Sequence, residues 1–351
     1  MKRGKFLKLL VCVGLIVVVQ LATISMASAV VNWRMPCFWA KGSYYYTING
    51  PEFADLVKKM SNGEMNITVF GPGELVKALD QVDAIARGTF EMMVWHDGYW
   101  AGKDIGIGYY GYIPFADMNI DDFDYWMHEE GGIELARDFY SKSNIYYIGN
   151  GGYSDLEPVF SKKPINKLED FKGLKMRSSG VALSFFKEMG ASVVALGGDE
   201  TYEALSRGVI DAVEHTPSSM MLDMGIHEVT KYAVEPMKHQ PFTNIAYYAN
   251  AAAWQKLPDH LKAVVFAATR QQLLRLRNES HKKEPEAKKF LLSKGMKFIS
   301  FPQKEQDRMA AVAQKLWKVH AKQTPFAGKV IRSMTDYLKR EGRLPKDYKL
   351  D

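Results

Sequence analysis

The chain has 351 residues, of which 47% are hydrophobic and 25% charged, and its formal net charge at pH 7 is +6. Four of the positive charges lie within residues 1–29, which carry no negative charge, so the rest of the chain has a net charge of only +2. This balance argues against a nucleic-acid-binding protein, because no long run of Lys or Arg follows residue 29. The length predicts two domains with separate cores.

The N-terminus has the features of an export signal. Basic residues precede the apolar stretch "LLVCVGLIVVV", and "ASA" at residues 27–29 offers a cleavage site after Ala29. We therefore expect residues 1–29 to be a signal peptide; the alternative is an uncleaved membrane anchor. Cys12 would leave with the signal, and Cys37 would then have no partner for an internal disulfide.

Beyond the signal, the hydrophobic pattern alternates strands with helices, which is typical of an α/β fold with largely parallel strands. The first group comprises strands at 30–35, 65–70 and 89–95 and helices at 50–63 and 75–88. The pattern starts again near residue 145, with strands at 145–150, 174–180, 191–196 and 209–215 and helices at 168–173, 182–190 and 199–208. The C-terminal part is mostly helical, with long helices at 259–295 and 303–323.

One local motif occurs twice, once in each group. "AIARG" ends at Gly88 and "ALSRG" ends at Gly208, and a short apolar strand follows each. Gly at this position is typical of a helix that ends in a left-handed residue. The repeat predicts two lobes built from the same helix, turn and strand.

Charged side chains follow two of the strands in the second group. Arg177 ends the strand in "LKMRSSG", and Glu214 and His215 end the strand in "VIDAVEH". Because ligands of α/β sheets bind beyond the carboxyl ends of strands, Arg177 can offer its planar guanidinium to a carboxylate. A carboxylate beside it can pair with the Arg or hold a cation. The alternatives are a surface Arg in an ordinary ion pair and a Glu214 that only neutralises Arg177.

Aromatic residues gather in the segment from Trp95 to Phe115, where glycines separate them. Such a segment can wall a pocket, although aromatic stripes belong to a core more often. The sequence contains no His-Glu-x-x-His, Gly-x-Ser-x-Gly or phosphate-binding Gly-x-x-x-x-Gly-Lys motif, which weakens an enzyme hypothesis.

Several stretches resemble one known family, and they occur in that family's order. They are "VFGPGELV", "AIARGTFEM", "GKD", "GGIELARDFY", "EDFKGLKMR", "GGDETYEALSRGVIDAVE" and "WQKLP". The chain is similar over nearly its whole length after the signal to the extracytoplasmic solute-binding proteins, family 7, of TRAP (tripartite ATP-independent periplasmic) transporters. Within the family it most resembles the branch that binds 2-oxo acids and lactate.

The resemblance implies a two-lobed α/β fold of the periplasmic-binding-protein type, with hinge strands and a helical C-terminal region. It places lobe 1 at residues 30–150 plus about 241–275 and lobe 2 at 151–240. The helices of about 276–351 would pack across both lobes.

The resemblance also assigns residues to a site. Arg177 matches the carboxylate-binding Arg, and Glu214 and His215 match positions that help to hold a metal ion bridging protein and ligand. The 2-oxo-acid branch has an aromatic residue at the place of His215. A further metal and substrate ligand is expected in "GGYSDLE", with Asp155 the choice and Ser154 the alternative.

Aromatic residues complete the implied substrate site. Tyr99 and Trp100 match the ligand-facing segment before "GKD", and Phe38 and Tyr44 fall in the first loop.

The implied function is transport and not catalysis. In the periplasm the protein would capture a small organic acid, such as pyruvate or lactate, and deliver it to the TRAP membrane permease. No cofactor is expected to be required, although the resemblance allows a bound Na⁺ or Ca²⁺ that bridges to the ligand. The branch includes homodimers. The alternatives are a bulkier aromatic or sulfonated acid as ligand, and a secreted metal-dependent enzyme that uses Asp155, Glu214 and His215.

Overall fold

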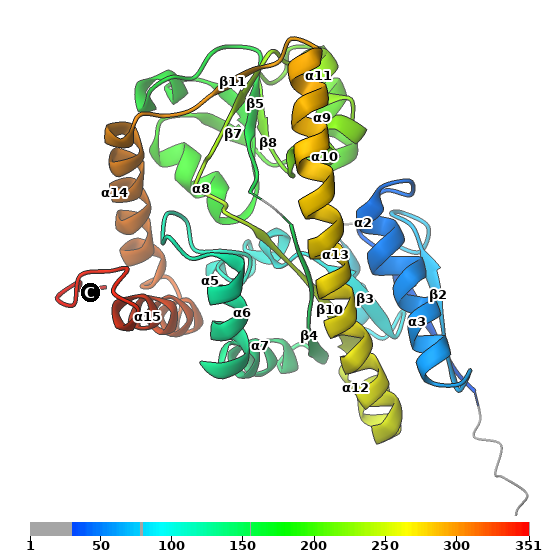
Figure 1. Cartoon of the computed structure of the whole chain (residues 1–351). Helices are drawn as coiled ribbons and strands as arrows, with labels where there is room; N and C mark the ends of the chain where they lie inside the picture. The colour runs from blue at the N-terminus through cyan, green and yellow to red at the C-terminus, as the bar shows by residue number, and fades with distance from the viewer. Residues whose placement is uncertain (1–29, 78–79, 155, 351) are drawn as a thin grey trace, which may run out of the picture.

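Three sheets organise the part of the chain that the structure, a computed structural model, describes, namely residues 30–77, 80–154 and 156–350 (Figure 1). Strand β1 (Val31–Pro36) pairs in parallel with β2 (Met65–Phe70). A second sheet has the order β3-β10-β4 and is antiparallel throughout; its strands are β3 (Met92–Trp95), β10 (Thr243–Asn250) and β4 (Ile145–Ser154). We call the part built on these two sheets the first lobe.

The third sheet has six strands, in the order β11-β9-β5-β8-β6-β7, and we call the part built on it the second lobe. β5 is antiparallel to both of its neighbours, and the other pairs are parallel. The strands are β5 (Val159–Ser161), β6 (Lys175–Arg177), β7 (Ser192–Val194), β8 (Ala212–Glu214), β9 (Tyr232–Val234) and β11 (Lys297–Ile299).

The helices of the first lobe are short. Buried Phe53 and Val57 lie four residues apart on α3, which is the spacing of one apolar helix face. Asn119 and Asp122 form a reciprocal capping box at the start of α6. The helices are α2 (Tyr44–Thr47), the π-helical turn η1 (Ile48–Glu52), α3 (Phe53–Met60), α4 (Gln81–Ala86), the 3₁₀ turn η3 (Asp97–Trp100), α5 (Ile105–Gly108), α6 (Ile120–Glu129) and α7 (Gly132–Ser141).

The helices of the second lobe and of the C-terminal region are η4 (Leu168–Phe171), α8 (Gly180–Glu188), α9 (Gly198–Ser206), α10 (Ser218–Asp223), α11 (Ile226–Val229), α12 (Ala251–Lys256), α13 (Asp259–Ser293), α14 (Gln303–His320) and α15 (Pro325–Arg340). The helices predicted at 168–173, 182–190, 199–208, 259–295 and 303–323 occur in that order as η4, α8, α9, α13 and α14, and α10, α11, α12 and α15 were not predicted.

Helix α13 is the longest element and contacts both lobes. It packs on β4 and α3 of the first lobe and on α10 of the second, and Figure 1 shows it running beside both. At the other side of the molecule, α14 contacts η4 and α8 while α15 contacts α5 and α7. Helices α13, α14 and α15 thus contact elements of both lobes, and the division of the chain into lobes and C-terminal helices stays a prediction. β11 lies in the C-terminal region that was predicted to be mostly helical.

The predicted helix at 75–88 is too long. α4 begins at Gln81, and residues 72–76 form turns and bends, while residues 78–79 lie outside the described part of the chain. The reason lies in Glu74, whose carboxylate accepts a hydrogen bond from the Gly71 backbone N–H at 2.7 Å and pairs with Lys41. Glu74 thus closes the turn at Gly71 instead of starting a helix.

The repeated motif makes the same turn twice. Gly88 has φ +77° and Gly208 has φ +74°, and the next residue donates its N–H back to Ala84 and Ala204 respectively, at 3.0 and 2.9 Å. This is the left-handed helix end that the glycines predict. The prediction of a repeated unit, one in each lobe, is confirmed.

Two of the connections between the lobes run from β4 to β5 and from β9 to β10. They run side by side, because the Glu157 N–H donates to the carbonyl oxygen of Gln240 at 3.2 Å. The Phe115 N–H donates to the carbonyl oxygen of Lys238 at 2.8 Å and ties a first-lobe loop to the same place. In residues 30–77, 80–154 and 156–350, no helix is long and apolar enough to cross a membrane.

Candidate functional site

Arg177 lies at the carboxyl end of β6 and is completely buried. Its Nε donates to the carbonyl oxygen of Leu196 at 3.0 Å, and Nη1 donates to the carbonyl oxygen of Glu214 at 2.7 Å. These carbonyl groups follow β7 and end β8, the strands on either side of β6. The sheet edge therefore fixes the guanidinium, and the alternative of a surface Arg is wrong.

The first lobe meets Arg177 through the turn η3. Arg177 Nη2 donates to Tyr99 Oη at 3.0 Å, and the Phe38 ring lies 4.8 Å from the Tyr99 ring. The backbones approach closely here, because a Cβ added to Gly180 would lie 3.1 Å from the carbonyl oxygen of Gly98. Gly180 also has φ +59°, so two observations require glycine at the start of α8. Tyr99, Phe38 and Arg177 thus come together where the lobes touch.

Glu214 is buried beside Arg177, but its carboxylate faces other groups. Oε2 accepts a hydrogen bond from Ser178 Oγ at 2.7 Å, and Oε1 lies 3.7 Å from His239 Nε2. Burial acts to raise the pKa of Glu214, but His239, Arg177 and Ser178 outweigh it and hold the pKa below its usual range. Glu214 is therefore an ionised carboxylate whose backbone, and not its side chain, bonds Arg177.

A second buried carboxyl group, that of Glu157, lies against Glu214. Burial raises the pKa of Glu157 far above its usual range, and the Glu214 charge and a hydrogen bond with Glu214 add to this effect. Glu157 Oε1 accepts a hydrogen bond from Thr243 Oγ1. Glu157 and His239 come from the two connections between the lobes, so the site and the hinge share residues.

Sequence reasoning missed Glu157 and His239. Glu157 lies in the same "GGYSDLE" segment as Asp155 and Ser154. The sequence therefore predicted the segment, and the carboxyl group of this segment that lies against Glu214 is that of Glu157. Asp155 itself lies outside the described residues, and Ser154 Oγ accepts a hydrogen bond from the Thr243 backbone N–H at 3.1 Å. No motif pointed to His239.

Three other predicted residues lie around this centre. The Trp100 ring stacks on Tyr140, with centroids 5.5 Å apart and planes at 3°. Tyr44 Oη lies 3.0 Å from Ser219 Oγ and so joins α2 of the first lobe to α10 of the second. His215 is half-buried, and a Cβ at Gly198 would lie 2.6 Å from its Nε2. The roles of these residues in ligand binding stay predictions.

The imidazoles near Arg177 carry no charge at neutral pH. Burial lowers the pKa of His96 to about 4, and burial followed by the Arg177 charge lowers the pKa of His215 well below its usual value. The positive charge that an anion meets here is therefore that of Arg177. The one N–H of neutral His96 lies on Nδ1 and donates to the carbonyl oxygen of Asn244 at 3.1 Å.

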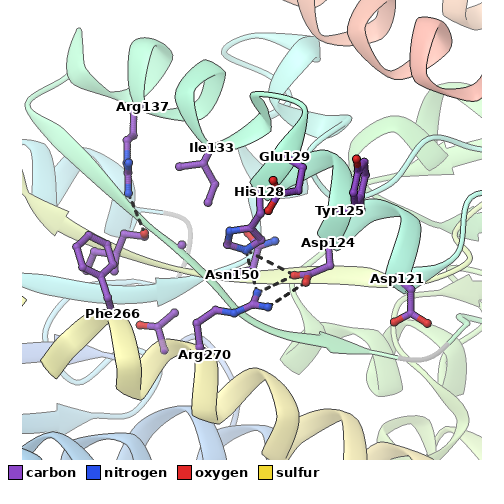
Figure 2. Close-up of a pocket in the computed structure, with 13 residues that line it drawn as sticks. Asp121, Asp124, Tyr125, His128, Glu129, Ile133, Arg137, Asn150, Phe266 and Arg270 are labelled. Atoms are coloured by element: carbon purple, nitrogen blue, oxygen red, sulfur yellow. Dashed lines mark hydrogen bonds and ion pairs between the residues drawn. The ribbon is translucent and has the colours of Figure 1, made fainter. Parts of the chain in front are cut away.

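Two surface pockets lie away from Arg177. One of about 680 Å³ lies between α6, α7, β4 and α13 and includes Arg137, Phe266 and Arg270 in its walls (Figure 2). Another of about 630 Å³ is lined by residues that include Asp117, Lys238 and Arg343. Of the predicted substrate residues that the structure describes, all but Asp155, none lines either pocket.

A cation site does not form from the described residues alone. Over the described ranges, no group of three or more His, Cys, Asp or Glu side chains is placed to hold a metal ion. Calcium takes six to eight oxygen ligands, and the imidazole of His215 suits softer metals. Glu214 also shares its oxygens with Ser178, so Asp155 and oxygens of a ligand would have to complete such a site.

Asp97 is a further buried carboxylate with a strong pH dependence. Burial raises its pKa to about 6 from an ordinary value of 3.8, against hydrogen bonds from Tyr140, Tyr248 and Asn244. The folded state therefore binds a proton between about pH 4 and 6 that the unfolded state does not, and Asp97 contributes less to stability as pH rises through this window.

We expect Asp97→Asn to remove this pH dependence. Urea unfolding at pH 4.5 and 7.5 gives the free energy of unfolding for both proteins, and the shift in pKa corresponds to roughly 3 kcal/mol at most. From pH 4.5 to pH 7.5, the free energy of unfolding should fall more in the wild type than in the variant. Equal changes in both would contradict the assignment to Asp97.

The comparisons with known proteins agree on one family. The family model described as bacterial extracellular solute-binding protein, family 7, matches residues 38–324. The monocarboxylate 2-oxoacid-binding periplasmic protein of Nostoc sp. (strain PCC 7120) is 30% identical over 273 residues, which is 78% of this chain and 74% of the relative.

Two solved structures show the same fold. A TRAP periplasmic solute-binding protein from Colwellia psychrerythraea, with bound calcium and pyruvate, has a TM-score of 0.84 and 26% identity, over 89% of this chain and 95% of that one. A TRAP solute-binding protein from Bordetella bronchiseptica, a dimer with calcium and picolinate in an active site, has the same TM-score and identity, over 89% and 93%. The two-lobed α/β fold is that of these proteins. The chain therefore belongs to family 7 of the bacterial extracellular solute-binding proteins, the extracytoplasmic components that bind small organic anions for TRAP membrane permeases.

Proposed function

We propose that this protein captures a small monocarboxylate of the 2-oxo or 2-hydroxy acid class, such as pyruvate or lactate, on Arg177 and delivers it to a TRAP permease. The observation that carries the proposal is the buried guanidinium at the contact between the lobes. Its bonds to Leu196, Glu214 and Tyr99 use three of its five N–H groups. One N–H on each Nη atom has no partner among the described residues, and a carboxylate accepts such a pair side by side.

The closed lobes exclude water from the bound anion. Arg177 belongs to the second lobe, and Tyr99 and Phe38 belong to the first. An anion that binds both sides is held more tightly by the closed arrangement than by an open one, and this difference in affinity is what drives closure. Tyr44 and Ser219 add a second polar contact between the lobes at α2 and α10.

An aromatic monocarboxylate is the second candidate ligand. The rings of Phe38, Tyr99 and Trp95 lie 4.8 to 5.9 Å apart beside Arg177 and offer aromatic faces to a planar ligand. The picolinate in the Bordetella bronchiseptica relative is an acid of this kind. A bulkier or sulfonated acid would use the same Arg177.

Cation binding by Asp155, Glu214 and His215 stays a prediction. The Colwellia psychrerythraea relative holds calcium together with pyruvate. Of the three predicted ligands, the structure places one carboxylate there, that of Glu214, and Ser178 shares it, so no binding step is assigned to an ion.

Export fits the proposed role. The signal peptide at residues 1–29 lies outside the described residues, and its cleavage after Ala29 would release the protein into the periplasm. A homodimer also stays part of the proposal, since the Bordetella bronchiseptica relative is a dimer.

Isothermal titration of the purified protein with pyruvate, lactate and picolinate tests the proposal. We expect one of these acids to bind with one-to-one stoichiometry and to be recovered unchanged after incubation. Binding of none of them, with a correctly folded protein, would contradict the monocarboxylate function. Conversion of the acid to a product would favour the alternative of a secreted enzyme.

A further inference from the structure

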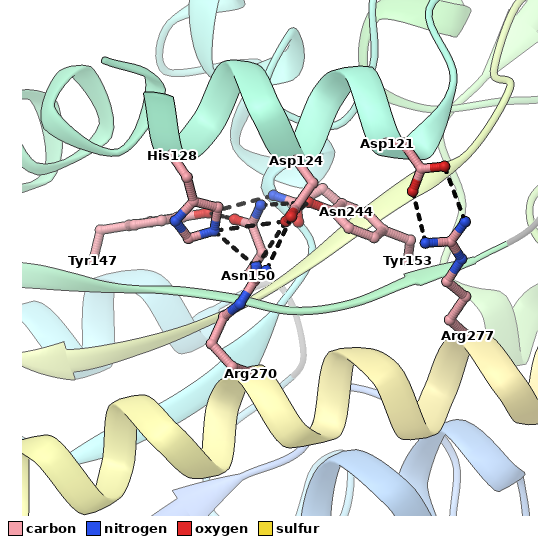
Figure 3. Close-up of polar contacts among 9 residues, drawn as sticks. All are labelled: Asp121, Asp124, His128, Tyr147, Asn150, Tyr153, Asn244, Arg270 and Arg277. Carbon is pink, nitrogen blue, oxygen red and sulfur yellow. Dashed lines mark hydrogen bonds and ion pairs between the residues drawn. The ribbon is translucent and has the colours of Figure 1, made fainter. Parts of the chain in front are cut away.

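A chain of buried hydrogen bonds runs through the β3-β10-β4 sheet away from Asp97, the first residue of η3. Figure 3 shows its part from Asn244 to Arg270. Asn244 on β10 donates from Nδ2 to Asp97 Oδ2 and to Tyr147 Oη, at 3.4 Å in each case. Tyr147 Oη then donates to Asn150 Oδ1 on the same strand, β4. The first half of the chain thus joins the turn η3 to the middle of β4.

The second half continues to the outer surface of the molecule. Asn150 Nδ2 donates to Tyr153 Oη at 2.6 Å, and Tyr153 Oη donates to Asp124 Oδ1 at 3.0 Å. Asp124 on α6 receives both Nη atoms of Arg270 on α13, at 2.7 and 3.0 Å. Asn150, Asp124 and Arg270 line the surface pocket of Figure 2.

Between Asn244 and Asp124, every donor points toward Asp124, while Asn244 also donates to Asp97 at the inner end and Arg270 donates to Asp124 at the outer end. Each of the two tyrosine hydroxyl groups accepts one hydrogen bond and donates one, so neighbouring bonds polarise each other. The side chains of Tyr147, Asn150 and Tyr153 are at most 1% exposed, and no water can replace a lost partner easily. Removal of one hydroxyl group therefore disturbs the bonds on both sides of it.

The inner end of the chain fixes the turn that carries Tyr99. Asp97 Oδ1 accepts hydrogen bonds from Tyr140 and Tyr248, both at 2.5 Å, in addition to the bond from Asn244. The turn packs closely on His96, because a Cβ at Gly98 would lie 2.4 Å from His96 Nε2.

We propose that this hydrogen-bonded chain holds Tyr99 in place against Arg177, and that Tyr153 is consequently a positioning residue for anion binding. The hydroxyl group of Tyr153 bonds Asn150 and Asp124, so it acts on the ligand only through the chain. The inference rests on the proposed function, because it assigns to Arg177 and Tyr99 the binding of the anion.

The chain offers a matched pair of variants that separates positioning from stability. Tyr153→Phe removes a buried hydroxyl group inside the chain and keeps the ring against Phe123 and Phe242. Tyr110→Phe removes an equally buried hydroxyl group that donates to the carbonyl oxygen of Gly132 at 3.0 Å, outside the chain. Both variants should lower the melting temperature by similar amounts.

Titration with pyruvate then measures the affinity of each variant. We expect Tyr153→Phe to bind at least about threefold more weakly than Tyr110→Phe, which lies within the usual range of coupling through contact networks. Equal affinities of the two variants would overturn the proposal.

The same comparison can be made at the surface with two ion pairs between α13 and α6. Arg270→Ala removes the pair with Asp124, which belongs to the chain, and Arg277→Ala removes the two-bond pair with Asp121, which lies beside it (Figure 3). Only Arg270→Ala should weaken pyruvate binding. A loss of affinity of the same size in Arg277→Ala would also contradict the proposal.

A readout that needs no ligand keeps this inference separate from the proposed function. If the wild type does not bind pyruvate, the proposed function fails for that acid, and hydrogen–deuterium exchange of the unliganded proteins still tests the chain. Amides of residues 97–101 should exchange faster in Tyr153→Phe than in Tyr110→Phe. Unchanged exchange in this segment would overturn the positioning role.

Discussion

Replacement of Arg177 by Met is expected to weaken binding of the acid at least about 100-fold. Met keeps the apolar stem but removes two charge-assisted hydrogen bonds to the carboxylate, each worth roughly 1.5–3 kcal/mol. No other fixed positive charge was found beside the Arg177 guanidinium among its described contacts, and the neighbouring imidazoles are neutral. Isothermal titration with the acid that the wild type binds measures the loss.

Arg137→Met is a matched control for this variant. Arg137 also donates to two backbone carbonyl groups, those of Tyr147 and Ile148, but it lies in the surface pocket. Both variants should lose some stability, and only Arg177→Met should lose binding. If a folded Arg177→Met protein kept its affinity for the acid, Arg177 would not be the residue that binds the carboxylate.

Replacement of Glu157 and of Glu214 by Gln is expected to change stability in opposite directions. The raised pKa of Glu157 means that its contribution to stability falls as pH rises above about 4.5, since the folded protein must keep a proton there that the unfolded chain gives up. Gln resembles the protonated form, so Glu157→Gln should be more stable than the wild type at pH 8, by about 1–3 kcal/mol, and similar to it near pH 5.

Glu214→Gln should instead be destabilised at pH 8 by roughly 3 kcal/mol. The lowered pKa of Glu214 means that its ionised form stabilises the folded state above its ordinary titration range, and this contribution is lost as pH falls through the folded-state pKa. Gln removes the charge next to His239 and Arg177, and a buried pair that loses one partner is costly. Urea unfolding at pH 5 and pH 8 checks both variants, and the reverse order of stability at pH 8 would contradict this account of the pair.

Local patterns allowed the sequence to predict much of the fold. The glycines at positions 88 and 208 indicated the two helix ends, because the left-handed conformation is a property of the residue itself. The hydrophobic spacing predicted the long helices at 259–295 and 303–323, which the structure has at Asp259–Ser293 and Gln303–His320. Where a side chain from elsewhere interferes, as Glu74 and Lys41 do before α4, spacing predicted a helix that is too long.

The aromatic segment shows why packing was harder to predict. Tyr109, Tyr110 and Tyr112 were candidates for a pocket wall, and they are buried in the core. Tyr99, from the same segment, lies at Arg177. The sequence of the segment alone does not distinguish these positions, since the difference comes from the helices that cover it, such as α15 against α5.

The part of the candidate site that lies at the ends of neighbouring strands was predictable from the sequence. Arg177 and Glu214 end adjacent parallel strands, so β topology places them together. Glu157 and His239 come from the two connections between lobes, and their meeting depends on how those connections run side by side. This three-dimensional relation has no signature in the sequence around either residue.

A crystal structure of the protein with pyruvate, or with the acid that titration identifies, tests the central claim most directly. The account predicts both carboxylate oxygens of the acid at about 2.7–2.9 Å from Arg177 Nη1 and Nη2, with Tyr99 beside them. An acid bound at another place, with no contact to the Arg177 guanidinium, would contradict it.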